Sequence, residues 1–210
     1  MNEPTVFIVD NNPDICQAIS ETVESIPLPT ESFSSANAFL EHYSIYRVGC
    51  LLLDVHMPEM DGLQLQRHLN QYKYRLPIIF MTSRGDIRTA VTAMKHGAMD
   101  YLEKPLQPDQ ISNLLKQAVD IDRKRQQLRL EHAAIQARVN NLTPREREVL
   151  DLVIHENTNR KIADYLGVSI KTVEFHRSRV MQKMHAHSLL ELAEMVKKND
   201  ASEPADTPTH

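Results

Sequence analysis

The stretch Cys50-Leu51-Leu52-Leu53-Asp54 places four apolar residues in a row and ends them with an acid. A short apolar run of this kind is typical of a strand that is buried on both faces of a sheet. Similar β-rich runs lie before and after it, at Thr5–Val9, Thr30–Phe33, Pro77–Thr82 and Asp100–Glu103. Helical patterns separate these runs, at Pro13–Ser25, Ser35–His42, Gly62–Gln71 and Asp86–His96, and a fifth helix opens at Pro108. We therefore expect an α/β doubly wound fold with a five-stranded parallel sheet.

Polar side chains end the predicted strands at one edge of this sheet. Asp10, Asp54 and Thr82 each close a strand, and Lys104 ends the fifth. Ligands of such sheets bind beyond the carboxyl ends of the strands. Two carboxylates repel each other, so their proximity favours a Mg²⁺ ion beside them or a nucleophile that becomes an aspartyl-phosphate. A threonine hydroxyl and a lysine ammonium can hold the phosphoryl oxygens.

The charge of the chain divides into two unequal halves. Of the 210 residues, 1–122 hold 9 Lys and Arg against 16 Asp and Glu, whereas 123–210 hold 15 against 12. An acidic first half and a mildly basic second half predict two domains with different partners. The two cysteines lie in apolar segments and suit free thiols, and no run resembles a signal peptide or a membrane span. We expect a cytoplasmic protein without a membrane partner.

A helical pattern without Pro or Gly continues from Pro108 to Val139. Apolar residues recur in it every seven positions, at Ile121, Leu128 and Ile135, but the positions between them are mostly charged or polar. One apolar seam of this kind is a weak coiled-coil signal. The favoured interpretation is a solvated linker helix, and the alternative is a linker that also packs against a second subunit.

The second half opens with a helix start at Thr143. Thr143 suits the N-cap, Pro144 the first helical position, and Glu146 completes a capping box. A second helix over Asn159–Leu166 ends at Gly167, which suits a left-handed C-cap. Ser169 caps a third helix to Met184, and a fourth follows at Ser188–Val196. Two short helices around a glycine turn form a helix-turn-helix pattern within an all-α four-helix domain.

The third of these helices has an unusual outer face. Helical periodicity places Val173, Val180 and Met184 on its buried side. An exposed Phe175 then lies among basic and hydrogen-bonding side chains, which suits a helix that reads the major groove of double-stranded DNA. Phe175 suits a thymine methyl and Glu174 a cytosine amine, and the other candidates for base or phosphate contacts are Lys171, Thr172, His176, Arg177, Ser178, Arg179 and Lys183. The simpler alternative is a solvated amphipathic helix.

The residues at the strand ends resemble the receiver signature of bacterial two-component systems, and Gly85–Pro105 is especially similar to receivers of the FixJ type. The resemblance implies that Asp54 accepts a phosphoryl group from a sensor histidine kinase and that Lys104 pairs with it. It also implies that Thr82 and Tyr101 act as the switch residues, and that Mg²⁺ is held by Asp10, Asn11, Asp54 and the backbone carbonyl of His56.

One departure from the family pattern concerns the metal. Receivers usually carry two or three consecutive acids after the first strand, where this chain has Asp10-Asn11-Asn12. An Asn carbonyl can coordinate Mg²⁺ but brings no negative charge, so we expect a weakened site. We further consider that His56 and Arg84 tune the lifetime of the phosphoryl group, although both also suit ordinary loop side chains.

Residues 142 to about 197 resemble the helix-turn-helix of the LuxR/NarL/FixJ family, through Leu142–Leu150, Lys161-Ile-Ala, Leu166-Gly-Val-Ser and Lys171–His176. In that family the third helix enters the major groove and the fourth pairs two subunits, which implies a homodimer in the active state. Lys161 replaces an acid common at its position, and Arg179 replaces a common Asn.

The sequence thus predicts a transcriptional response regulator controlled by phosphorylation of Asp54, with no enzymatic activity beyond phosphoryl acceptance and self-dephosphorylation. The alternative is a DNA-binding regulator whose degenerate receiver is switched by protein contacts. A dehalogenase-type phosphatase is excluded because position 12 is Asn, and an ATP-driven activator because there is no Walker loop. We expect a receiver over 1–122, a helical linker over 123–140, a LuxR-type helix-turn-helix domain over 141–198 and a disordered tail over 199–210.

Overall fold

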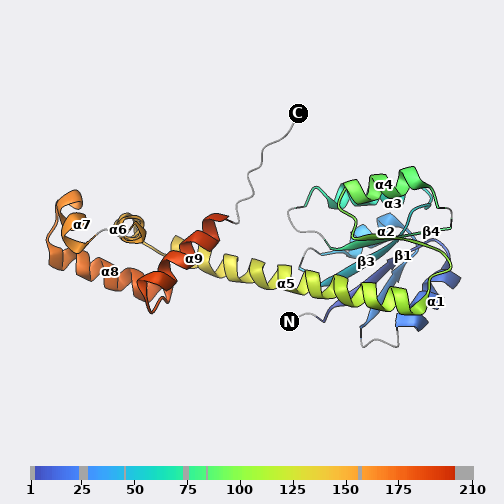
Figure 1. The fold of residues 1–210 in the computed structure, drawn as a ribbon, viewed down its shortest axis with the longest axis horizontal. Coiled ribbons are helices and arrows are strands. Elements are labelled where there is room, and N and C mark those ends of the chain that lie inside the picture. Colours follow the sequence, from blue (N-terminus) through green and yellow to red (C-terminus); the bar gives the residue numbers. More distant parts are fainter. Residues whose placement is uncertain are drawn as a thin grey trace. The chain divides into compact units, whose positions relative to one another are not determined.

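The computed structural model describes residues 3–23, 28–44, 46–72, 76–83, 85–155 and 158–201. The chain divides into two compact units, Met1–Gln126 and Gln127–His210. We refer to them as the α/β unit and the helical unit (Figure 1). No helix of the described residues is long and apolar enough to cross a membrane.

The α/β unit is built on a five-stranded parallel sheet with the order β2-β1-β3-β4-β5. The three central strands are fully buried, which explains their nearly continuous apolar sequences. The strands are β1 (Thr5–Val9), β2 (Thr30–Phe33), β3 (Gly49–Asp54), β4 (Ile78–Thr82) and β5 (Asp100–Glu103). The predicted sheet is confirmed, and each strand begins within one residue of its predicted start.

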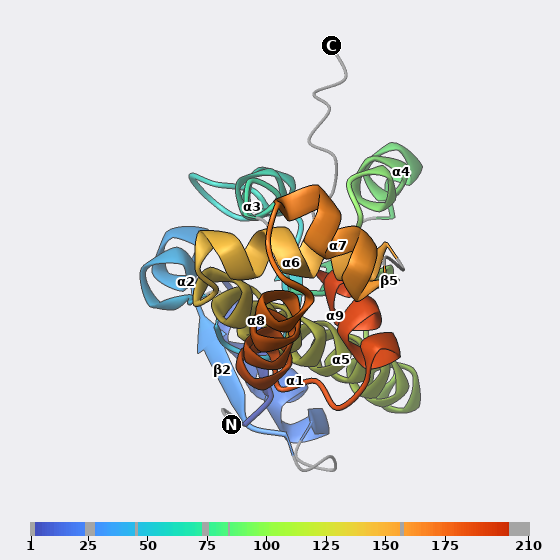
Figure 2. The same ribbon diagram turned by 90° about the vertical axis from the view of Figure 1, so that its left-hand side faces the viewer.

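Helices cover both faces of the sheet (Figures 1 and 2). One face packs against α1 (Pro13–Val23) and the first part of α5 (Pro108–Asn140). The opposite face packs against α2 (Ala36–His42), α3 (Gly62–Leu69) and α4 (Ile87–Lys95). The end of the first predicted helix, Glu24 and Ser25, lies outside the described residues.

Side-chain caps fix where the helices of the second face begin. Ser35 accepts a hydrogen bond from the Ala38 amide, and Asp61 forms a capping box with Gln64. Asp86 caps α4. Asp61 and Asp86 therefore hold the loops at the carboxyl edge of the sheet, because each cap satisfies amides that a helix leaves unpaired at its start.

Helix α5 continues without a break past the expected domain boundary after residue 122. Of the three apolar residues spaced by seven, only Ile135 is buried, in the core of the helical unit. Leu128 is 55% exposed and Ile121 is also exposed. The exposure of both fits a solvated linker helix, and the packing of this seam on a second subunit stays a prediction.

The helical unit contains α6 (Pro144–Ile154), α7 (Asn159–Leu166), α8 (Ile170–Met184) and α9 (Leu189–Ala201) (Figure 2). The Thr143–Glu146 capping box, the left-handed Gly167 (φ 64°) and the Ser169 cap are all confirmed. The helical unit has one hydrophobic core. It contains buried residues of α6, α7 and α8, together with Ile135 of α5 and Leu192 of α9.

The predicted start of the disordered tail at residue 199 is wrong. Helix α9 extends to Ala201. The side-chain amide of Asn199 donates a hydrogen bond of 2.7 Å to the side-chain oxygen of Gln136 in α5. The two residues are 63 positions apart, so no local sequence pattern could predict this contact. Residues 202–210 lie outside the described residues.

Candidate functional site

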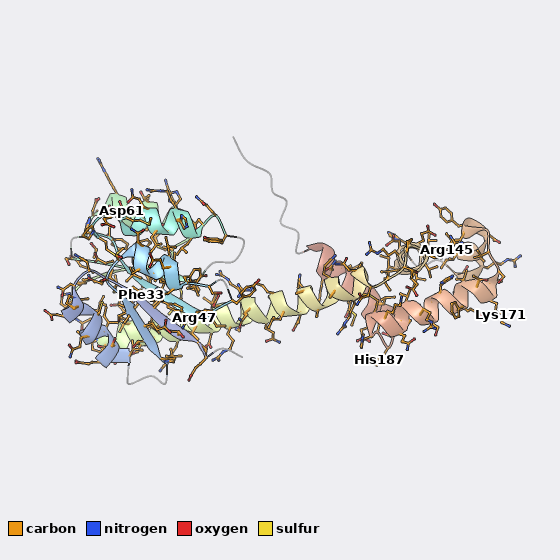
Figure 3. The ribbon with its side chains drawn as sticks, turned by 180° about the vertical axis from the view of Figure 1, so that it is seen from behind. Phe33, Arg47, Asp61, Arg145, Lys171 and His187 are labelled. Atoms are coloured by element: carbon orange, nitrogen blue, oxygen red, sulfur yellow. The ribbon has the colours of Figure 1, made fainter. Side chains whose placement is uncertain are left out.

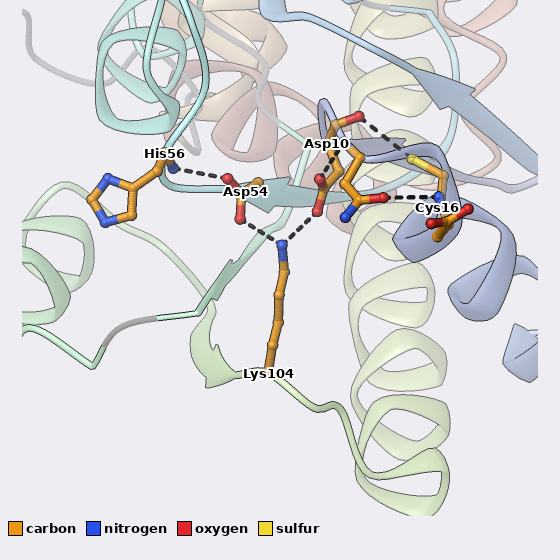
Figure 4. Close-up of polar contacts among 7 residues, drawn as sticks. Asp10, Cys16, Asp54, His56 and Lys104 are labelled. Carbon is orange, nitrogen blue, oxygen red and sulfur yellow. Dashed lines mark hydrogen bonds and ion pairs between the residues drawn. The ribbon is translucent and has the colours of Figure 1, made fainter.

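The strand-end residues predicted from the sequence meet at the carboxyl edge of the sheet. Asp10 and Asp54 are 1% and 5% exposed, and Thr82 is fully buried. The Lys104 ammonium reaches between the two carboxylates, 2.5 Å from Asp10 Oδ2 and 2.6 Å from Asp54 Oδ1 (Figure 4). The ammonium thereby offsets the repulsion of two carboxylates that share one site.

The second oxygen of each carboxylate accepts a hydrogen bond from a backbone amide. The Asn12 amide donates to Asp10 Oδ1 and the His56 amide to Asp54 Oδ2, both at 2.9 Å (Figure 4). Each amide lies two residues after the acid that it contacts, so the loop after the strand orients the side chain at the strand end. Both carboxylates are therefore held in fixed orientations before any ligand binds.

The charge of Lys104 is stabilised by its two partners. Burial lowers the pKa of a lysine, but the hydrogen bonds to Asp10 and Asp54 outweigh burial and raise the pKa of Lys104 above its ordinary value of 10.5. The ammonium is thus charged throughout the physiological pH range. It can serve as a permanent positive partner for an anion at this edge.

A cavity of about 650 Å³ opens in front of these residues. Its lining includes Asn11, His56, Ser83 and Asp86 in addition to the two carboxylates and Lys104. Asn12 also lines it, but its side-chain oxygen accepts from the Asp14 amide and so caps α1. Asp14 lines the neighbouring groove, as expected from a helix that begins at Pro13.

The oxygen donors of this cavity fit Mg²⁺, although the negative charge is low. Mg²⁺ takes one or two carboxylates, keeps several waters and accepts backbone or amide carbonyls. Asp10 and Asp54 supply two carboxylates at the cavity wall, beside Asn11 and His56. The described residues contain no group of three or more His, Cys, Asp or Glu placed to bind a metal. The kinds of oxygen donor at this cavity suit Mg²⁺.

The predicted switch aromatic, Tyr101 on β5, points into the unit. Its ring lies 6.3 Å from the Phe80 ring, and it packs on the core under α3 and α4. Its hydroxyl is buried and has no hydrogen-bond partner among the described residues. Such a group costs about 1–3 kcal/mol, so the inward rotamer is held against a penalty.

The outer face of α8 combines an exposed aromatic ring with polar side chains. Phe175 is 57% exposed, and the Arg179 guanidinium lies 5.6 Å from the centroid of its ring. The His176 ring packs on it in a T-shaped arrangement, with 5.5 Å between the two ring centroids. Lys171 lies exposed at the N-terminal end of the helix (Figure 3), and Glu174 and Ser178 are exposed on it. Thr172 is half-buried and hydrogen-bonded to Ser169.

Two predicted phosphate contacts are instead bonded within the helical unit. The Arg177 guanidinium donates to the side chain of Asn159 at the start of α7. The Lys183 ammonium lies 2.6 Å from the buried Glu146 carboxylate, and it also donates to the Asn141 carbonyl. Arg177 and Lys183 thus position α8 against its neighbours. No local pattern could predict either contact, because the partners lie 18 and 37 residues away.

The Glu146–Lys183 pair makes the helical unit sensitive to acid. The ion pair with Lys183, together with the Thr143 amide, holds the pKa of Glu146 below its ordinary value of 4.5. A carboxyl group whose pKa is lower in the folded than in the unfolded state stabilises the fold at pH values above its unfolded pKa. This stability is lost as pH falls through the folded pKa. Between about pH 5 and pH 3, Glu146→Gln should lose less stability than the parent.

Urea denaturation of the full chain, followed by NMR signals of Val173 and Val180, measures this difference. Glu148→Gln is the matched control, since Glu148 pairs with Arg145 at the exposed surface of the same helix. If the parent and Glu146→Gln lose the same stability between about pH 5 and pH 3, the acid sensitivity does not come from the Glu146–Lys183 pair.

Comparison with known proteins identifies both units. The model of the response regulator receiver domain matches residues 6–116, and that of the bacterial regulatory proteins of the luxR family matches residues 140–196. Response regulator protein TmoT of Ectopseudomonas mendocina is 35% identical over 93% of this chain and 89% of its own length. Transcriptional regulatory protein FixJ of Bradyrhizobium diazoefficiens is 33% identical over 90% of this chain and 93% of its own.

The chain is a two-component response regulator of the NarL/FixJ family. The structure of response regulator StyR is similar over 93% of this chain and 99% of its own, with a TM-score of 0.87 and 36% identity. Full-length FixJ from B. japonicum is similar over 96% of this chain and 99% of its own, with a TM-score of 0.56 and 31% identity. The family is one of DNA-binding transcription regulators rather than enzymes.

In this response regulator the structure brings Asp10, Asp54 and Lys104 together as predicted, with Asn11 and His56 at the same cavity. Thr82 ends β4 at the same edge of the sheet, where its carbonyl accepts from the Lys104 amide, and its buried side chain is not among the described residues that line the cavity. Sequence reasoning missed Ser83 and Asp86 as lining residues. Both follow Thr82 within four positions, so the rule that ligands bind beyond strand ends applied to them as well. Arg84, considered together with His56, lies outside the described residues.

Proposed function

We propose that Asp54 is the phosphoryl acceptor of this response regulator. The observation that supports this proposal is the Lys104 bridge between Asp10 and Asp54 at the mouth of an open cavity. A carboxylate oxygen of Asp54 forms a bond to phosphorus while the phosphorus–nitrogen bond of a phosphohistidine breaks. The electron pair of that bond stays with the imidazole of the sensor histidine kinase.

The other residues of the site stabilise the charge of the phosphoryl group. Lys104 shifts from the Asp54 carboxylate to a phosphoryl oxygen, and Thr82 donates its hydroxyl to another. Thr82 and Tyr101 are the switch residues in this proposal. Tyr101 already points into the unit, with a buried hydroxyl that lacks a partner among the described residues, so in this proposal the movement of Thr82 stabilises that inward position.

Asp10, Asn11, Asp54 and the His56 carbonyl are the ligands that we assign to Mg²⁺. When bound, the ion neutralises the negative charge that gathers at the carboxylates and the phosphoryl oxygens. Asn11 in place of an acid lowers the charge of the donor set, so the affinity for Mg²⁺ is lower than in receivers with two acids.

The output of this switch is double-stranded DNA binding by α8. Phe175 and Glu174 face base edges, and the exposed basic residues Lys171 and Arg179 contact phosphates. The phosphorylated chain acts as a homodimer, which places two recognition helices on half-sites about one DNA turn apart. We place the protein in the cytoplasm, where the buried Cys16 and Cys50 remain free thiols.

The two arginines of α8 should respond differently to salt. Each phosphate contact contributes about 0.9 to the slope of log K against log salt concentration. Arg179→Ala should lower that slope by about this amount with little change in sequence preference. Arg177→Ala should weaken binding without lowering the slope, because Arg177 bonds Asn159. Fluorescence anisotropy with labelled DNA across a series of salt concentrations measures both slopes. An equal decrease of the slope in the two variants would contradict a phosphate contact by Arg179 alone.

A degenerate receiver is the second candidate. It is favoured by the two Asn residues after Asp10, which leave fewer negative charges at the cavity than acids would. In that case protein contacts rather than phosphate set DNA affinity. DNA affinity measured with and without a small phosphodonor, in the parent and in Asp54→Ala, separates the two. Control by phosphorylation requires that the phosphodonor raises the DNA affinity of the parent and does not change that of Asp54→Ala.

A further inference from the structure

A buried carboxylate lies where α5 leaves the α/β unit. Asp122 is 1% exposed, although it belongs to a segment that reads as a charged surface helix, Asp120 to Arg125. Its Oδ2 accepts a hydrogen bond of 3.0 Å from the backbone amide of Gly49, the first residue of β3. The contact joins residues 73 positions apart.

The backbone at Gly49 is fixed from several sides. Gly49 pairs with Thr5 of β1, and the Thr5 amide donates to the Val48 carbonyl. The side chain of Arg47 donates to Thr5 Oγ1 and to both oxygens of Glu31 (Arg47 is labelled in Figure 3). The amide that meets Asp122 therefore belongs to a rigid part of the sheet.

A second contact lies one helical turn further along α5. The side-chain amide of Gln126 donates a hydrogen bond of 3.1 Å to the Tyr46 carbonyl. Asp122 and Gln126 are four residues apart and so share one face of the helix. Together they attach two successive turns of α5 to the segment Tyr46–Gly49, which leads into β3.

Burial of this carboxylate is costly for stability, because a charge removed from water must be compensated by hydrogen bonds. Its negative charge adds to burial in raising the pKa of the Cys50 thiol. A carboxylate that is buried at this cost and accepts from a strand amide is suited to fixing geometry.

We propose that Asp122 is a positioning residue that anchors the root of the linker helix to the start of β3. Gln126 extends the anchor by one turn. The strand that ends at Asp54 is thus hydrogen-bonded at its other end to the helix that continues toward the helical unit. The anchor holds the turns of α5 around Asp122 and Gln126 against the segment that leads into β3.

Amide hydrogen exchange of the full chain tests the anchor. Asp122→Ala should speed exchange of the amides of residues 121–128 by about tenfold, the factor expected for loss of a hydrogen bond to a charged group. Gln126→Ala should speed it by about threefold. Asp120→Ala is the matched control, because Asp120 is an exposed acid of the same helix. In this variant the amides of residues 121–128 should exchange as fast as in the parent.

Asp122→Asn separates hydrogen bonding from packing. The Asn keeps an oxygen acceptor for the Gly49 amide and should restore most of the protection that Asp122→Ala loses. Exchange of residues 121–128 that is equal in the parent and Asp122→Ala overturns the proposal, as does an equal increase in Asp120→Ala. If Asp122→Ala does not fold, Gln126→Ala decides, and unchanged exchange in that variant overturns the proposal.

Discussion

Gly49→Ala should unfold the α/β unit. A Cβ at this position would lie 1.8 Å from the backbone oxygen of Thr5, and the φ of 154° is unfavourable for any side chain. The obstructing atom is a strand carbonyl with no room to move. The substitution should therefore cost more than about 4 kcal/mol, a large part of the stability of a domain of this size.

Gly97→Ala is the control for this prediction. Gly97 also has a positive φ, of 86°, but no atom of the described residues beyond its chain neighbours lies within 4 Å of the position that its Cβ would take. Its replacement should cost only the backbone strain, about 1–3 kcal/mol. Urea denaturation of the full chain, followed by NMR signals of the β1 and β3 amides, measures both. Equal losses at the two glycines would show that the clash is relieved and that the strand pairing is looser than described.

Removal of Lys104 should have the next largest effect on the fold. Lys104→Ala leaves Asp10 and Asp54 buried together without their shared counter-ion. Breaking a buried ion pair by loss of one partner typically costs about 3–5 kcal/mol. We expect a loss of this size near pH 7 in the absence of Mg²⁺. Lys116→Ala, at an exposed position of α5, should be close to the parent.

The pH dependence of the parent's stability follows from the raised pKa of Lys104. In the parent the pKa of Lys104 is raised, so its contribution is fully present below its ordinary value of 10.5 and is lost as pH rises through the folded value. Lys104→Ala should lack this loss of stability at high pH, because it has no ammonium at this site. Stability equal to that of Lys116→Ala at pH 7 would contradict this account.

Local patterns predicted the sheet and the grouping of charged side chains at its carboxyl edge. The apolar run at 50–54 and the acids and threonine at strand ends depend only on neighbours in sequence, and parallel strands bring such ends to one edge. The same holds for the caps at Thr143 and Ser169, where the partner lies three residues away.

Contacts between distant residues could not be predicted in this way. Arg177 and Lys183 have the residue type and spacing of phosphate contacts, and only the packed unit shows that they meet Asn159 and Glu146. Asp122 resembles its exposed neighbours in sequence and is buried because α5 crosses the start of β3.

Phosphorylation of Asp54 is the central claim, and intact-protein mass measurement tests it directly. The full chain is treated with a small phosphodonor and Mg²⁺ in three forms: the parent, Asp54→Ala and Asn11→Asp. The parent should gain the mass of one phosphoryl group, Asp54→Ala should gain none, and Asn11→Asp should react at lower Mg²⁺ concentration, since an added carboxylate strengthens the site. A parent that stays unmodified while Asn11→Asp is modified would contradict the claim and establish a degenerate receiver.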